Sequence, residues 1–221
     1  MNKPTLLFFG IFASFAFAWW GMAMVPHSQM SALQPQVDED TNEAYPVNMG
    51  GAHNAGRDIY IANGCQVCHS QEIRDPHNGS DLKRGWGKRR TVPLDYFYDQ
   101  NVVLSQVRIG PDLANIGARK DEKDAAKYTA AWHYQHLYYP RYTSPESNMP
   151  AYRYLFDKRR ITGERAVDAL SVEVEDGWQV VPSAQAKTLV SYLLALDRSH
   201  ELKKSAAPAP AAPATAAPAT K

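Results

Sequence analysis

The chain has 221 residues, which suits one compact domain with appended segments. Its 24 basic and 23 acidic residues give a formal net charge of +1, whereas a nucleic-acid partner would select a strongly basic face. Both cysteines of the chain belong to one short motif, so the cysteine count by itself does not indicate a redox compartment.

The first predicted element is a membrane-spanning helix over residues 1–26. No charged residue occurs from residue 5 to residue 25. A helix of about 21 residues rises roughly 30 Å, the hydrocarbon thickness of a bilayer. Lys3 is the only basic residue near either end, so the positive-inside bias places the N-terminus in the cytoplasm and the rest of the chain across the membrane.

A cleaved signal peptide is the alternative for the same segment. Ala16-Phe17-Ala18 fits a cleavage site of the A-x-A kind after an apolar core. Against cleavage, the apolar run continues beyond Ala18, and only Lys3 precedes it. We therefore predict an uncleaved anchor.

Three further segments divide the rest of the chain. Residues 27–52 form a predicted polar tether, because prolines and an acidic run interrupt any helical or strand periodicity. Residues 205–221 are an Ala/Pro tract, whose prolines forbid a regular helix and whose side chains are too small for a core, so we predict a disordered tail. The folded domain is left with residues 53–204.

Within that domain, three helices and one small hairpin are predicted. The helices cover residues 55–63, 123–139 and 183–198. Leu170, Val172 and Val174 alternate with polar residues, and an Asp-Gly turn leads into residues 178–181, which predicts a β-hairpin. The fold class is therefore mainly α with a small β-hairpin insertion.

The motif that carries chemistry is Cys65-Gln66-Val67-Cys68-His69, the C-x-x-C-H attachment signature of c-type haem. Its spacing lets two thiols reach one porphyrin edge and the next imidazole ligate the iron. A dithiol redox site would need a βαβ context and would not need His69. A zinc site would need further cysteines, and the chain has none. The motif predicts one covalently bound haem c, attached through Cys65 and Cys68 and ligated by His69.

The second axial ligand is predicted to be Met149. It is the only methionine after the motif, and it stands in a loop before Pro150. A methionine thioether is a common axial ligand in electron-carrying cytochromes. The histidines that compete for this role are His77, His133, His136 and His200. For His133 and His136, three residues apart on a predicted helix, an amphipathic surface position is a sufficient explanation.

Two further features belong to this predicted site. Pro111, in a Gly-Pro-Asp-Leu turn, offers a carbonyl that would accept a hydrogen bond from the ligating imidazole. A basic cluster comprises Lys83, Arg84, Lys88, Arg89 and Arg90. This cluster would contact the haem carboxylates or an acidic partner, or form a solvated loop.

Several blocks of the sequence resemble subunit II of cbb3-type cytochrome c oxidases, the mono-haem, membrane-anchored subunit. They are GRDIYI at 56–61, GCQVCHSQ at 64–71, RIGPDLANIG at 108–117, PESNMPAY at 145–152 and LVSYLLAL at 189–196. Trp132-His133 and His136-Leu137 also match. The G-P-D-L and M-P-A-Y blocks in this order discriminate better than C-x-x-C-H, which all c-type cytochromes share.

The resemblance implies a cytochrome c fold whose first and last helices cross near Gly56 and Tyr192. It implies thioethers at Cys65 and Cys68, axial ligation by His69 and Met149, and support of His69 by Pro111.

The implied function is electron relay to the haem-copper catalytic subunit of a terminal oxidase, alongside other cytochrome c subunits. The chain would have no active site of its own, because both axial positions of its iron are filled. Its haem domain would lie on the periplasmic side of a bacterial inner membrane. The alternatives are a mono-haem cytochrome subunit of another membrane enzyme, such as nitric oxide reductase, and a free anchored carrier.

Overall fold

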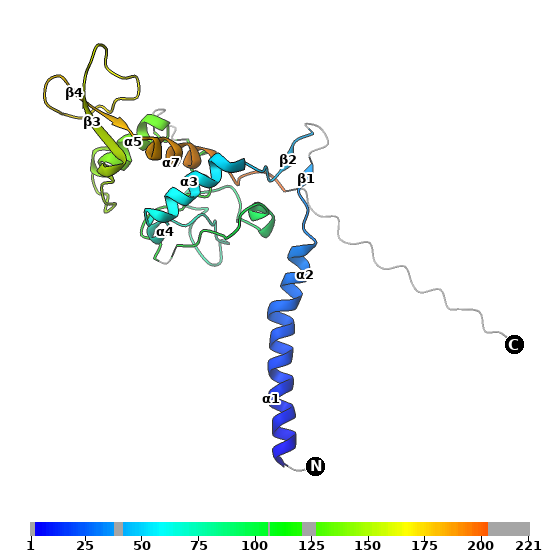
Figure 1. The fold of residues 1–221 in the computed structure, drawn as a ribbon. Coiled ribbons are helices and arrows are strands. Elements are labelled where there is room, and N and C mark those ends of the chain that lie inside the picture. Colours follow the sequence, from blue (N-terminus) through cyan, green and yellow to red (C-terminus); the bar gives the residue numbers. More distant parts are fainter. Residues whose placement is uncertain (1–2, 38–41, 106, 121–126, 203–221) are drawn as a thin grey trace.

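The computed structural model describes residues 3–37, 42–105, 107–120 and 127–202 (Figure 1). A helical stem leads into a domain of helices and irregular chain, with two small antiparallel strand pairs. The predicted tail at residues 205–221 lies outside the described residues, as does the start of the helix predicted at 123–139.

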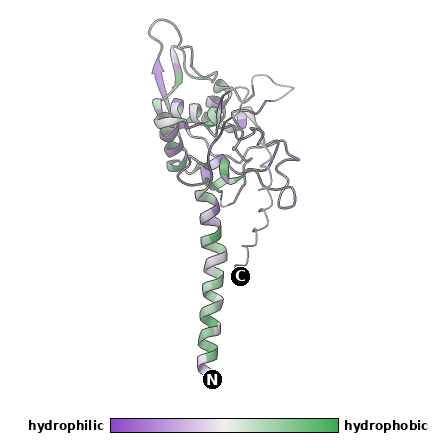
Figure 2. Cartoon of the chain, turned by 90° about the vertical axis from the view of Figure 1, so that its right-hand side faces the viewer, coloured by the Kyte–Doolittle hydropathy of each residue, from purple (hydrophilic) through white to green (hydrophobic). Residues whose placement is uncertain are grey.

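The stem is one long apolar helix. It comprises α1 (Lys3–Trp19), a π-helical turn η1 (Trp20–Met24) and α2 (Val25–Ser31). Pro26 lies in the first turn of α2 and has no N–H to donate, which accounts for the wider turn before it. The helix Lys3–Ser31 is long and apolar enough to cross a membrane, and Figure 2 colours most of its N-terminal part as hydrophobic. This agrees with the predicted spanning helix over residues 1–26, although the observed helix continues to Ser31.

The predicted tether contains more regular structure than its sequence indicated. After the stem, strand β1 (Gln36–Val37) pairs antiparallel with β2 (Ala44–Tyr45), so that Gln36 lies opposite Tyr45. Helix α3 then begins at Gly50, within the segment that was expected to be irregular. Strands of two residues are too short to show an alternating pattern, and a helix that begins with two glycines has no apolar side chains in its first residues. The sequence pattern therefore indicated neither.

The domain is built around the crossing of α3 (Gly50–Ala62) and α7 (Ala184–Ala195), which lie side by side in Figure 1. The helices approach closely at Gly56, where a Cβ atom would meet the side chain of Tyr192 and lie 2.8 Å from the carbonyl oxygen of Thr188. The crossing expected near Gly56 and Tyr192 is therefore present. It supplies much of the buried core, including Tyr60, Ala186, Leu189, Val190, Tyr192 and Leu193.

Helix boundaries follow local capping. The Ser183 hydroxyl accepts a hydrogen bond from Ala186 N at 3.3 Å, as the N-cap of α7 should. Helix α5 (Ala130–Tyr138) starts at the cap Thr129, later than predicted. Pro140 ends α5 but opens the short helix α6 (Pro140–Thr143), where its missing N–H costs nothing.

The predicted hairpin was wrong in its strand pairing. Strand β4 (Trp178–Pro182) pairs antiparallel with β3 (Phe156–Arg160), which follows a 3₁₀ turn η3 (Arg153–Leu155). The alternating segment at 170–174 forms no strand and makes one backbone contact to β4, from Leu170 N to Val180 O at 2.9 Å. In this loop Leu170 is buried and Val172 and Val174 are half-buried, and alternation alone does not distinguish such a loop from a strand.

The irregular region between α4 (Cys65–Cys68) and α5 is organised by buried carboxylates. Asp81, Asp95 and Asp112 are all buried, and Asp95 caps a 3₁₀ turn η2 (Pro93–Tyr96) by accepting from Val92 N at 2.8 Å. Asp81 accepts from Arg74 and Arg108. Side-chain hydrogen bonds to these carboxylates therefore hold this region together, which explains why its sequence shows no periodic apolar pattern.

Candidate functional site

One cavity of about 820 Å³ is lined by all five residues that the sequence singled out: Cys65, Cys68, His69, Pro111 and Met149. Its volume lies in the range of about 300–1,000 Å³ that is usual for ligand pockets. The walls come from the C-terminal end of α3, α4 (Cys65–Cys68), α5, α7 and the loops at 109–119 and 144–152. Apolar side chains from these elements include Leu113, Ile116, Leu137, Leu189 and Leu193.

The two cysteines are presented by a single helical turn. Gly64 adopts a left-handed conformation (φ 71°) that ends α3 and allows α4 to start at once. His69 N then donates to Cys65 O at 3.0 Å, which closes the turn. The two cysteines form no disulfide with each other, and burial raises the pKa of the Cys65 thiol to about 11.

The imidazole of His69 is held by the Gly-Pro turn. Its Nδ1 lies 2.8 Å from Pro111 O, and because a carbonyl only accepts, Nδ1 carries the proton and Nε2 keeps its lone pair. Gly110 N donates to Cys68 O at 3.0 Å, and a Cβ on Gly110 would come within 2.5 Å of the His69 Nδ1. Burial lowers the pKa of His69, so the ring is neutral.

Asp112 joins this turn to the motif, a role that the sequence had not indicated. Its buried carboxylate accepts from Ser70 Oγ at 2.6 Å, Glu72 N at 2.8 Å and Ala114 N at 2.8 Å. Three hydrogen bonds from both segments fix the turn against the chain that follows His69.

Met149 belongs to the loop at 144–152, which forms another wall of the cavity. It is partly buried and packs against the core. Met149 N donates to Ser147 Oγ at 3.2 Å. Tyr152 N donates to Leu137 O at 2.8 Å, which ties this loop to the end of α5.

His133 and His136 also line the cavity, so the expectation that they are surface residues was wrong for both. Only 5% of His133 is exposed, and burial lowers the pKa of each histidine to about 4. Thr143 donates its hydroxyl to Pro140 O at 3.1 Å, so it must accept from His136 Nδ1 at 2.5 Å. His136 therefore presents a neutral ring with a free lone pair on Nε2. Helix α5 is covered on more than one face, which the i, i+3 spacing did not reveal.

The other two histidines lie elsewhere. His77 is exposed in a turn, and His200 stacks on Tyr45 with ring centroids 4.4 Å apart. Neither lines the cavity.

Comparison with protein-family models matches residues 5–198 to the family described as cytochrome c oxidase, mono-heme subunit/FixO. The chain belongs to the FixO family. The resemblance to subunit II of cbb3-type oxidases is therefore confirmed. No curated protein matches the chain significantly.

A FixO mono-haem subunit needs a pocket for the porphyrin carboxylates, and the cavity has a polar wall that fits them. Arg119 Nε and His133 Nε2 are buried and have no hydrogen-bond partner within the described residues. Lys127 and Tyr128 complete this wall. Nothing in the motif spacing marked Arg119, whose guanidinium also donates to Asp112 O at 2.9 Å and lies 5.6 Å from the centroid of the Tyr128 ring. Thiols, an imidazole, a thioether and the buried Arg119 guanidinium on apolar walls together fit a haem.

The basic cluster at 83–90 does not belong to this wall, so its expected contact with the haem carboxylates is not supported. Arg89 instead binds the buried Asp95 through two hydrogen bonds of 2.8 and 2.7 Å. Arg84 lies over the ring of Trp86, with the guanidinium carbon 5.0 Å from the ring centroid. Lys83, Lys88 and Arg90 are exposed.

Proposed function

We propose that this FixO-family chain is the membrane-anchored electron-transfer subunit of a cbb3-type terminal oxidase, with one covalently bound haem c. The observation that carries the proposal is the convergence of Cys65, Cys68, His69 and Met149 on one apolar cavity, although Met149 is 80 residues distant in sequence. The haem iron would supply one-electron chemistry by cycling between its ferrous and ferric forms.

The chain's residues attach and orient the group. Cys65 and Cys68 each add a thiol across a vinyl group to form a thioether. His69 ligates through Nε2, while Pro111 holds the ring in one tautomer and one orientation. Met149 would supply the second protein ligand to the iron, and its thioether would favour the ferrous form.

The polar wall holds the haem carboxylates. Arg119 Nε and His133 Nε2 are buried nitrogen atoms without a partner in the described structure, and leaving them so would cost about 1–3 kcal/mol each. A carboxylate placed there would accept a hydrogen bond from Arg119 Nε, which always carries a proton. His133 takes part as a donor when the proton of its neutral ring is on Nε2.

The function as a relay follows from filled axial positions and from the anchor. With His69 and Met149 both bound to it, the iron would have no open position for oxygen, so the chain would serve a partner that reduces oxygen. The spanning helix keeps the domain at the membrane surface, at high effective concentration near a membrane-embedded acceptor. We place the domain on the periplasmic side of a bacterial inner membrane.

The test is purification of the full chain through a tag at Lys221 in mild detergent. We expect a polytopic haem-copper subunit, other cytochrome c subunits, and oxygen uptake driven by a reduced cytochrome donor. His69→Ala should abolish that uptake while the complex still assembles, and His77→Ala is the matched control with uptake unchanged. Recovery of the haem-loaded chain alone in several gentle detergents would contradict the oxidase role and support the anchored carrier.

Covalent attachment is tested separately on denatured protein. Haem should remain on the wild-type chain after acid-acetone extraction, and Cys68→Ala should lose it or give a one-thioether pyridine haemochrome. Val67→Ala, between the two cysteines, should retain haem fully. Free extraction of haem from the wild type would contradict haem c.

A further inference from the structure

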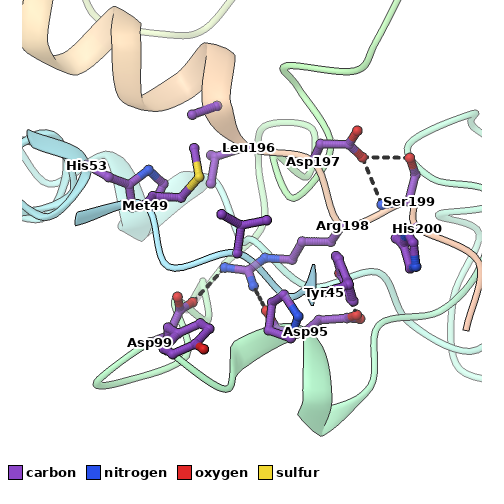
Figure 3. A pocket seen from close by; sticks show the side chains of 14 residues that line it. Tyr45, Met49, His53, Asp95, Asp99, Leu196, Asp197, Arg198, Ser199 and His200 are labelled. Carbon is purple, nitrogen blue, oxygen red and sulfur yellow. Dashed lines mark hydrogen bonds and ion pairs between the residues drawn. The ribbon is translucent and has the colours of Figure 1, made fainter. Parts of the chain in front are cut away.

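The segment that leads from the membrane helix is held firmly against the domain, at a place distant from the haem cavity. A pocket of about 340 Å³ lies there, between β2, the loop at 95–99 and the chain that follows α7 (Figure 3). The side chains labelled in Figure 3 come from these segments and from the start of α3, and the Arg198 guanidinium is drawn bonded to Asp95 and Asp99.

Asp95 binds groups from two different parts of the chain. Its oxygens accept from Tyr45 Oη at 2.7 Å and from the Arg89 guanidinium at 2.8 and 2.7 Å. Only 3% of Asp95 is exposed, so these bonds form where water does not compete for the carboxylate. Hydrogen bonds to a charged partner are the stronger kind in proteins.

Tyr45 is fixed by its ring as well as by its hydroxyl. The ring stacks on His200 at 4.4 Å between centroids and 14° between planes. Arg89 Nε donates to His200 O at 2.7 Å, so the same arginine holds both Asp95 and the residue against which Tyr45 stacks. Burial and the hydrogen bond to Asp95 raise the pKa of the Tyr45 hydroxyl, which keeps it a donor.

The surface beneath this contact is cross-linked by the buried Arg198. Arg198 is 8% exposed, and its guanidinium donates to Asp95 O and to Asp99 Oδ2, the latter at 2.6 Å. The same guanidinium lies 4.4 Å from the centroid of the Tyr96 ring. Tyr45 therefore binds a pre-organised site on the domain.

Pairing between β1 and β2 also attaches the chain close to the end of the membrane helix. Gln36 lies opposite Tyr45, so the chain is already attached at Gln36. Between the end of α2 at Ser31 and Gln36 only residues 32–35 are left. Four residues reach at most about 14 Å, whereas a free coil over residues 32–52 would have a root-mean-square span of roughly 25 Å.

We propose that Tyr45 is a positioning residue that, through Asp95 and His200, holds the domain at a fixed height and orientation on its membrane helix. A held domain presents its cavity to one acceptor, whereas a swinging domain would sample many. This deepens the proposed function and rests on it only for the identity of the acceptor.

The experiment measures the distance between helix and domain in the full, haem-loaded chain in nanodiscs, without partner subunits. Spin labels are attached at Gln29 and Glu164, both exposed, through unnatural amino acids, since the cysteines carry haem. We expect one narrow distance distribution for the wild type. Tyr45→Ala should broaden it, and Tyr45→Phe, which keeps the stacking, should increase the detached population by about tenfold.

Tyr142→Ala, at a tyrosine that is 61% exposed, is the matched control and should leave the distribution narrow. Haem absorption and circular dichroism at the temperature of the measurement should be unchanged in all three variants, which separates positioning from folding. A broad distribution in the wild type, or a narrow one in Tyr45→Ala, would overturn the proposal. Neither result depends on copurification of an oxidase, so this inference and the oxidase role can fail independently.

Discussion

Three histidines line the haem cavity, and their hydrogen bonds assign them different capacities. His69 and His136 each donate from Nδ1, to Pro111 O and Thr143 Oγ1, and so each keeps a ligating lone pair on Nε2. His69 directly follows the attachment turn, while His136 stacks on Trp132 with centroids 4.7 Å apart. His136 is therefore the strongest rival of Met149 for the second axial position.

Substitution of Met149 distinguishes these ligands. Met149→Ala should abolish the weak charge-transfer band that thioether ligation produces at the red end of the ferric spectrum. Met149→His should lower the reduction potential, because imidazole stabilises ferric iron better than a thioether does. Met30→Ala, in the membrane helix, is the control. If the band survives in Met149→Ala, another residue is the ligand, and the double variant with His136→Ala shows whether imidazole replaces the lost sulfur.

A second residue-scale prediction concerns pH and the buried Asp81. Burial raises its pKa, but hydrogen bonds and charge from Arg74 and Arg108 outweigh this and hold the pKa below the ordinary value of 3.8. A depressed pKa stabilises the fold above pH 3.8, and that contribution is lost as the pH falls through the folded-state pKa. Asp81→Asn should lower the free energy of unfolding by on the order of 3 kcal/mol at pH 7.

Urea unfolding of wild type and Asp81→Asn at several pH values measures this. The difference should stay constant from pH 7 to 5 and shrink below about pH 4. Asp157→Asn, at an exposed carboxylate of β3, should change stability by less than about 0.5 kcal/mol throughout. A difference for Asp81→Asn that persists unchanged at the lowest pH would show that the carboxylate charge is not what stabilises the loop.

Sequence reasoning located the attachment motif, the Gly-Pro turn and the methionine loop, because each depends on local order along the chain. It did not locate Arg119 or Asp112. Their roles arise from contacts between buried polar groups that are distant in sequence, and such contacts leave no regular spacing of residues along the chain. The surface prediction for His133 and His136 failed for the same reason, since burial of a helix face is set by what packs on it.

At the scale of elements, the crossing of α3 and α7 depends on the absence of a side chain at Gly56. Gly56→Ala should destabilise the domain by about 1–3 kcal/mol, since the new Cβ would meet Tyr192 and the backbone of Thr188. Gly51→Ala lies in the same helix with nothing within 4 Å, and should be neutral or stabilising by up to about 1 kcal/mol. Chemical denaturation of both variants tests the pair, and equal effects would refute the close approach.

The elements also show where patterns succeed and fail. Helix α7 has a serine cap and an apolar stripe, so its start was predicted correctly, although its end at Ala195 precedes residue 198. Strand β3 is Phe-Asp-Lys-Arg-Arg, with four exposed residues and no alternation, so nothing in its sequence marked it as the partner of β4. The two-residue strands of the tether also had no sequence pattern that would predict them.

At the scale of the whole molecule, the helical stem and the domain are joined by very little free chain. Helix continues through residues 16–18, the candidate cleavage site, to Ser31. We expect the intact mass of membrane-extracted protein to include residues 1–18. High salt should not release the protein, because the stem is held by apolar burial and not by charge. A mature N-terminus at Trp19 would show that the segment is a cleaved signal.

The pairing of α3 with α7 also has a consequence for the order of events during synthesis. These helices are separated by about 120 residues, and a core of such high contact order closes late, after the C-terminal helix has left the ribosome. Cys65 is buried in the finished protein but lies on the early part of the chain. Its thiol would therefore be accessible for the proposed haem attachment before folding, and α7 would dock over that part of the chain afterwards.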